Sequence, residues 1–146
     1  MWPSGLHGSI THCVGYVAAA VGPSELIAAI GIDAEPDAPL PEGVLDVIAT
    51  PAERQVLAGT RVAPGDPHWD RLLFSAKEAV YKTWFPLVGE WLDHQEAEIR
   101  FDPETDSFAA ELSRDGLVID GHPILRLHGR WIRQHAIQVT VVAVSR

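Results

Sequence analysis

With 146 residues, 47% of them apolar and 21% charged, the chain has the composition of a folded protein and not of a disordered one. Its 11 basic and 20 acidic residues give a net charge of -9, which argues against a nucleic-acid surface because phosphate neutralisation needs clustered lysine and arginine. The longest apolar stretch, residues 14–32, is broken by glycine, proline, serine and glutamate. We therefore expect no membrane span, no signal peptide and a cytoplasmic location.

The N-terminal part of the chain has the pattern of strands. Residues 8–20 are expected to form two short strands around a turn at Gly15. Residues 26–35 form a further expected strand, which leads into the proline-rich loop 36–43. The chain should therefore begin with three extended segments.

Helices are expected in the middle of the chain, at residues 44–48, 51–57 and 67–85. In the second helix, Thr50 as N-cap, Pro51 at the first helical position and Glu53 at the third form a capping-box pattern. The third has apolar residues at three- and four-residue steps, which indicates an amphipathic helix with Asp66 near its start. Pro86 is expected to end it.

Alternating apolar and polar residues indicate antiparallel strands in the rest of the chain, at residues 97–101, 108–112, 125–132 and 137–144. Turn-rich segments such as 102–104 separate them. No internal repeat or linker interrupts residues 1–146. The expected architecture is a single α+β domain, in which an antiparallel sheet packs against one long helix.

Two carboxylates stand at the end of the third expected strand. Asp33 and Glu35 flank Ala34, and the two-residue period of a strand points both side chains to the same side. Such a pair suits Mg²⁺, which prefers oxygen ligands and is often completed by substrate phosphates. The spacing is equally compatible with acids that only cap the following turn.

On the long helix, Lys77, Glu78 and Lys82 lie away from the apolar stripe, which predicts that all three share its solvent side. The simplest interpretation is a solvated face with a Glu78–Lys82 pair, worth about 0.2–0.5 kcal/mol. The functional alternative combines a third carboxylate, as metal ligand or base, with two lysines that could balance phosphate charge.

The first strand carries polar side chains that could bind a phosphate. Ser9, Thr11 and His12 follow Gly8, which allows close approach of a ligand to the backbone. A lone histidine in a strand is more often structural. Cys13, the only cysteine, is interpreted as a small buried apolar residue.

Three motifs in this order resemble the phosphopantetheinyl transferases of the Sfp/EntD type, the enterobactin synthase component D group, and especially the actinobacterial enzymes of secondary metabolism. They are Gly8-Ser9-Ile10-Thr11-His12-Cys13, Gly31-Ile32-Asp33-Ala34-Glu35-Pro36, and Phe74-Ser75-Ala76-Lys77-Glu78-Ala79-Val80-Tyr81-Lys82-Thr83-Trp84-Phe85-Pro86-Leu87. The resemblance runs over nearly the whole chain. It implies that family's fold and the transfer of phosphopantetheine from coenzyme A to a serine of an acyl or peptidyl carrier protein.

The resemblance also implies roles for individual residues. The ligands of a catalytic Mg²⁺ would be Asp33, Glu35 and Glu78. The coenzyme A phosphates would be contacted by Ser9, His12, Lys77 and Lys82. Glu78 would take the proton from the carrier-protein serine, while the metal and the lysines, Lys82 among them, would neutralise the developing charge.

The chain also differs from the family it resembles. Members of this type are usually half again as long and built from two similar halves, with a basic stretch in the N-terminal half that binds coenzyme A. We therefore expect this chain to match the C-terminal part of that fold, without much of the N-terminal half, and to expose an apolar edge or patch.

Three functions stay open at this point. The first is an active transferase, either alone or as a homo-oligomer with a site shared between chains. The second is a truncated, non-catalytic remnant that binds metal, nucleotide or carrier protein. The third is a metal-dependent phosphohydrolase that uses the same acids with water as nucleophile.

Overall fold

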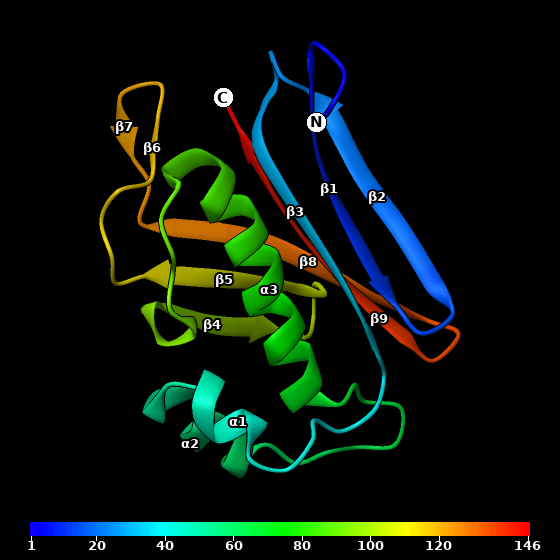
Figure 1. Cartoon of the computed structure of the whole chain (residues 1–146). Coiled ribbons are helices and arrows are strands. Elements are labelled where there is room, and N and C mark those ends of the chain that lie inside the picture. The colour runs from blue at the N-terminus through cyan, green and yellow to red at the C-terminus, as the bar shows by residue number, and fades with distance from the viewer.

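The computed structural model describes residues 1–146 and is built around a five-stranded antiparallel sheet (Figure 1). In spatial order its strands are β3 (Ile27–Pro36), β9 (Ile137–Ser145), β8 (Arg126–Gln134), β5 (Ser107–Leu112) and β4 (Ala97–Asp102). Each neighbouring pair is antiparallel, as the alternating sequence pattern predicted. Figure 1 shows that β3 and β9 cross the direction of β4 and β5 steeply, so the sheet is strongly twisted.

A separate hairpin of β1 (Leu6–Cys13) and β2 (Tyr16–Pro23) lies along the free edge of β3. Two hydroxyls make the connection: Ser9 Oγ accepts from the Ile32 amide at 3.1 Å, and Thr11 Oγ1 accepts from the Ala34 amide at 2.9 Å. Each pair is 23 residues apart, so β1 runs parallel to β3. Side-chain oxygens thus satisfy amides that a sheet edge would otherwise leave open.

The outer face of this hairpin is apolar. Ile10, Val17 and Val21 are all exposed there, and Val14 is exposed at the turn. An exposed apolar surface is what the resemblance led us to expect, and the hairpin is where it lies.

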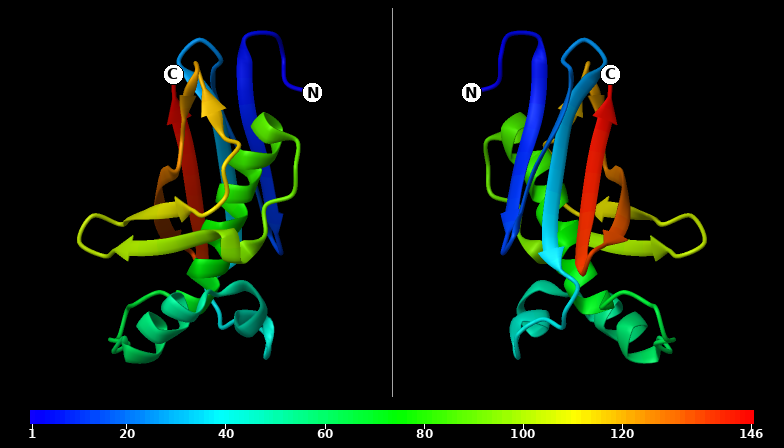
Figure 2. Two further views of the ribbon diagram at one scale, coloured as in Figure 1. Left: turned by 90° about the vertical axis from the view of Figure 1, so that its left-hand side faces the viewer. Right: turned by 90° about the vertical axis from the view of Figure 1, so that its right-hand side faces the viewer.

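The helix α3 (Trp69–Val88) packs across one face of the sheet (Figures 1 and 2). Leu72, Leu73, Val80 and Trp84 are fully buried under it and form the centre of the core with side chains from the sheet. Gly31 allows the closest approach: a Cβ there would stand 2.1 Å from the Ala79 carbonyl oxygen. The helix can therefore lie directly on β3.

The remaining elements are short: α1 (Val44–Ile48), α2 (Pro51–Gly59), the 3-10 turn η1 (His94–Glu96), β6 (Val118–Ile119) and β7 (His122–Pro123). The capping box of α2 is confirmed, because Thr50 Oγ1 accepts from the Glu53 amide and the Glu53 carboxylate accepts from the Thr50 amide. No helix is both long and apolar enough to cross a membrane.

The α+β fold class is confirmed, but the ends of the long helix differ from expectation. The helix continues through Pro86 to Val88, with Gly89 as C-cap, because a proline in the last turn removes only its own amide donor. The helix begins at Trp69 instead of residue 67, with His68 as N-cap, and Asp66 accepts from the amide of Ala63 in the preceding loop. The elements η1, β6 and β7 were not predicted.

Candidate active site

One side of α3 presents four polar side chains within about 60° of each other, at about 100° per residue. They are Arg71, Ser75, Glu78 and Lys82. Three of them contact β3: Ser75 Oγ donates to the Asp33 carbonyl at 3.4 Å, and the bonds of Arg71 and Lys82 are given below. This polar stripe follows from the sequence spacing of four, three and four residues.

Asp33 is the most buried of the three carboxylates around this polar stripe, which are Asp33, Glu35 and Glu78. Its Oδ1 accepts from Lys82 Nζ at 2.9 Å, and the same ammonium donates to the Ile32 carbonyl. Its Oδ2 is buried and has no hydrogen-bond partner. Burial, helped by the charge of the neighbouring Glu35 carboxylate, raises the pKa of Asp33 to about 7 against the opposing effect of Lys82.

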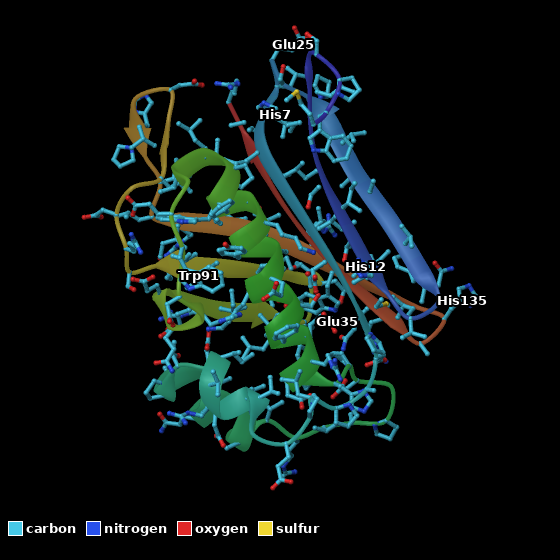
Figure 3. The ribbon with its side chains drawn as sticks, in the orientation of Figure 1. His7, His12, Glu25, Glu35, Trp91 and His135 are labelled. Carbon is cyan, nitrogen blue, oxygen red and sulfur yellow. The ribbon has the colours of Figure 1, made fainter.

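Glu35 faces the same helix. Its Oε2 accepts from Arg71 Nη1 at 3.2 Å, and the other guanidinium nitrogens donate to the carbonyls of Ala38 and Pro39. Since Asp33 and Glu35 both bind side chains of α3, the prediction that the two carboxylates point to one side of β3 is confirmed. Figure 3 shows Glu35 at the end of β3, beside the N-terminal half of α3.

Glu78 stands between Ser75 and Lys82 on the helix, but it pairs elsewhere. Its Oε1 lies 3.1 Å from Nε2 of His94, and both side chains are partly exposed. The expected Glu78–Lys82 pair is therefore not formed. The three acids that the resemblance singled out each have a different partner, and no group of three or more potential ligands is assembled for a metal.

The donors present nevertheless fit a hard cation. Carboxylate oxygens are what Mg²⁺ prefers, and the Oδ2 atom of Asp33 is a buried acceptor that no protein donor satisfies. Lys82 and Arg71 balance the charge of Asp33 and Glu35 in this structure. Asp33, with Glu35 and Glu78, remains the predicted ligand set.

Lys77 is not where the sequence pattern put it. It is 2% exposed and forms a 2.8 Å ion pair with Glu53 of α2. Its Nζ also donates to the carbonyls of His94 and Ala97. The prediction of a solvent-facing Lys77 is wrong. The spacing of residues in one helix could not reveal the partner, because Glu53, which neutralises the buried ammonium, lies 24 residues away in another helix. Its ammonium is not available to an external phosphate here.

Burial also perturbs Lys77 itself. Desolvation lowers the pKa of Lys77, while the hydrogen bond and charge of Glu53 oppose that shift. Glu53 is fully used as well, because its carboxylate accepts from the Ile99 and Thr50 amides in addition to the ammonium. This is a satisfied structural pair.

Ser9 and His12 lie on opposite faces of β1, since they are three residues apart in a strand. Ser9 is buried against β3 and its oxygen is engaged by the Ile32 amide, whereas His12 is exposed. The structure does not bring the two together, and their contacts to phosphate stay predictions. Burial, with the charges of Glu35 and Asp33, raises the pKa of Cys13, so this thiol stays neutral.

A cavity of about 430 Å³ lies beside Lys82, between the start of β1 and the C-terminal half of α3. Its walls include Trp2, Ser9, Tyr81 and Phe85. An apolar hollow with one lysine at its wall is typical of sites that hold a ligand with a charged group.

Sequence reasoning missed two contacts of this region, those of Arg71 and His94. Arg71 could have been found, because it begins the four-three-four spacing that ends at Lys82. His94 has no such local signal, since it approaches Glu78 through the loop after α3.

Comparisons with known proteins show the family of the chain. The model of the 4'-phosphopantetheinyl transferase superfamily matches residues 29–139. The chain is 48% identical over 144 residues to 4'-phosphopantetheinyl transferase Svp of Streptomyces mobaraensis, covering 99% of this chain and 58% of that protein. It is 45% identical over 149 residues to 4'-phosphopantetheinyl transferase PptT of Mycobacterium tuberculosis, covering 98% and 64%.

A third relative, 4'-phosphopantetheinyl transferase Npt of Nocardia iowensis, is 47% identical over 153 residues, with 99% of this chain and 68% of that protein covered. The chain has an α+β fold, and the family model matches most of it, residues 29–139. The chain belongs to the 4'-phosphopantetheinyl transferase superfamily. It spans less than two thirds of the length of Svp and PptT.

Proposed function

We propose that this chain transfers phosphopantetheine from coenzyme A to a serine of an acyl or peptidyl carrier protein in a magnesium-dependent reaction. The observation that carries the proposal is the junction of β3 and α3. There a buried, incompletely satisfied Asp33 meets Lys82, with Glu78 one turn away on the same side of the helix. Membership of the superfamily supports the reaction type.

Mg²⁺, held by Asp33, Glu35 and Glu78, would stabilise negative charge on the pyrophosphate of coenzyme A. Glu78 accepts the proton of the carrier serine, whose oxygen bonds to the β-phosphorus. The bond from that phosphorus to the bridging oxygen breaks, and adenosine 3',5'-bisphosphate leaves. Lys82 balances charge on the phosphates, and a base such as Glu78 contributes on the order of 10²–10⁴-fold.

The cavity beside Lys82 supports a position for part of coenzyme A. Its lysine would face a phosphate, while Trp2, Tyr81 and Phe85 offer apolar surface to the uncharged part of the molecule. We leave Lys77 out of this site, because its ammonium is engaged in the core. Ser9 borders the same cavity and fits a supporting role.

The wider setting follows from this proposal. We propose a cytoplasmic enzyme that acts in secondary metabolism and whose residues 1–146 form one domain, equivalent to the C-terminal part of the longer relatives. The exposed apolar residues Ile10, Val17 and Val21 would favour self-association. Sedimentation velocity, at several protein concentrations, tests that prediction directly.

The deciding experiment is intact-mass analysis of an apo carrier protein incubated with this chain, coenzyme A and Mg²⁺. We expect a metal-dependent mass gain of one phosphopantetheine, which disappears with EDTA and falls on the order of 10²–10⁴-fold in rate with Glu78→Gln. No gain with any of several apo carriers, from a chain whose folding is verified, would overturn the proposal.

A remnant that binds metal, nucleotide or carrier protein without transfer is the second candidate. The burial of Lys77 against Glu53 favours this candidate. Lys82 and Arg71 are then the basic groups beside the carboxylates, and both already form ion pairs with them. Calorimetric titration with coenzyme A distinguishes it, since a remnant would bind this polyanion weakly and never produce a modified carrier.

A further inference from the structure

Glu78 has a hydrogen-bond partner that is not among the residues so far given a role. Nε2 of His94 lies 3.1 Å from Oε1 of Glu78, and the contact spans 16 residues of sequence. No other protein group hydrogen-bonds to this carboxylate, so its second oxygen is left to solvent or substrate.

One face of the His94 imidazole packs against an aromatic ring of α3. Its ring stacks on Phe74, one turn before Glu78 on α3, with ring centres 6.3 Å apart and an interplanar angle of 19°. Stacking restrains the plane of the imidazole, and the hydrogen bond to Glu78 sets the direction of Nε2. The ring is thus presented to Glu78 in one orientation.

The backbone around His94 is fixed as well. Asp93 and Glu96 form a capping box around η1, and Tyr81 packs against Trp91 with ring centres 4.8 Å apart, which ties the preceding loop to α3. Figure 3 shows Trp91 beside that helix. The segment that carries His94 is therefore attached to the helix that carries Glu78.

The buried ammonium of Lys77 completes this support. Its Nζ donates to the carbonyl of His94 at 2.5 Å and to that of Ala97 at 2.9 Å, and it is neutralised by Glu53. Lys77 and Glu78 are neighbours in sequence, so a single turn of α3 holds both the backbone and the side chain of His94.

We propose that His94 is a positioning residue for Glu78: its imidazole holds one carboxylate oxygen so that the other is the oxygen available to the reacting groups. This inference rests on the proposed role of Glu78 in the transfer. Groups that orient a catalytic carboxylate act by restricting its rotamers, and losing them at metal and catalytic sites costs about 10–100-fold.

Two substitutions separate positioning from packing. His94→Phe keeps an aromatic ring against Phe74 but removes the hydrogen bond, whereas His94→Gln loses the ring and keeps an N–H donor. His128→Ala is the matched control, because His128 is an exposed histidine of β8 with no role in the site. Unfolding free energies of all variants establish that each one is folded.

We expect His94→Phe to lower kcat about 10–100-fold with little change in KM for coenzyme A, His94→Gln to keep most of kcat, and His128→Ala to match the wild type. In a Glu78→Gln background, His94→Phe should have no further effect on kcat. The reverse order, with His94→Phe active and His94→Gln impaired, would assign His94 to packing and overturn the inference.

A Mn²⁺ titration followed by electron paramagnetic resonance supplies a readout that does not need turnover. His94→Phe should weaken Mn²⁺ binding about 10-fold and His94→Gln should restore it. If the wild type transfers nothing while this order of affinities holds, the transferase proposal fails and the positioning of Glu78 stands. If the wild type transfers and His94→Phe equals it in both kcat and Mn²⁺ affinity, the inference alone fails.

Discussion

Two lysines of α3 form ion pairs with nearly the same N···O distance, but the two pairs differ in solvent exposure and in how completely their hydrogen bonds are satisfied. Lys77 and Glu53 are 2.8 Å apart, with side chains 1% and 3% exposed, and every charged atom has further partners. Lys82 and Asp33 are 2.9 Å apart, with side chains 28% and 7% exposed, and one oxygen of Asp33 has no partner at all.

The difference separates a pair that stabilises the fold from one suited to binding. A buried pair whose hydrogen bonds are complete resists exchange with an external ligand, because breaking it leaves an uncompensated charge. Asp33 retains an unsatisfied acceptor, and Lys82 can swing toward water. We therefore expect substitutions at the first pair to reduce stability and those at the second to reduce activity.

The largest effect on activity is expected at Asp33. Asp33→Asn should lower the rate of phosphopantetheine transfer at least about 100-fold, because even indirect changes around metal sites cost about 10–100-fold. Its free energy of unfolding should stay within about 1 kcal/mol of the wild type, since Lys82 remains solvated. Mass-spectrometric transfer rates and urea unfolding check both parts. A stable protein with normal turnover would remove Asp33 from the site.

The largest effect on stability is expected at Lys77. Lys77→Met leaves the Glu53 carboxylate buried without its cation, and should lower the free energy of unfolding by about 3–5 kcal/mol. Lys82→Met is the matched control on the same helix and should cost clearly less, because the pKa of Asp33 is raised to about 7 and this carboxyl can take up a proton when its cation is removed.

Equal losses of stability from the two lysine substitutions, measured in urea at one pH, would contradict the distinction between the pairs. A Lys77→Met protein that folds normally but loses affinity for coenzyme A would reinstate Lys77 as a phosphate ligand.

A smaller effect is expected where α3 touches β3. Gly31→Ala places a methyl group 2.1 Å from the Ala79 carbonyl, so the helix must move, at a cost of about 1–3 kcal/mol. The movement would also separate Lys82 from Asp33 and reduce transfer. Gly59→Ala, where nothing lies within 4 Å, should leave both unchanged or slightly improve stability. Thermal unfolding and transfer assays on the two variants test this.

How much the sequence could predict depended on whether a contact is local. The two-residue period of β3 correctly aimed Asp33 and Glu35 at one side, and the capping box at Thr50 was correctly recognised. Both depend on neighbours within a few residues. The fold class followed from such patterns together with the resemblance.

Non-local contacts explain the failures at Lys77 and His94. Helical periodicity separates apolar from polar residues, so it assigned Lys77 to solvent, although Glu53 in α2 provides a buried partner. The approach of His94 to Glu78 depends on the path of the loop after Gly89. The prediction that Pro86 ends the helix is wrong for a local reason, since a proline in the last turn removes only its own amide donor and the helix continues to Val88.

The smallest expected effect concerns the cap that supports the Glu53 carboxylate. Thr50→Ala removes the hydroxyl that accepts from the Glu53 amide, which costs about 1 kcal/mol when a cap serves only its own helix. Because the same carboxylate binds Lys77, the cap should also be coupled to the ion pair. The measurement is a double-mutant cycle of Thr50→Ala and Lys77→Met in urea, with Thr50→Ser as the variant that retains the acceptor. A coupling energy above about 0.5 kcal/mol would show that the cap and the ion pair stabilise the fold together. If the two losses of unfolding free energy simply add, the cap makes no contribution to the ion pair.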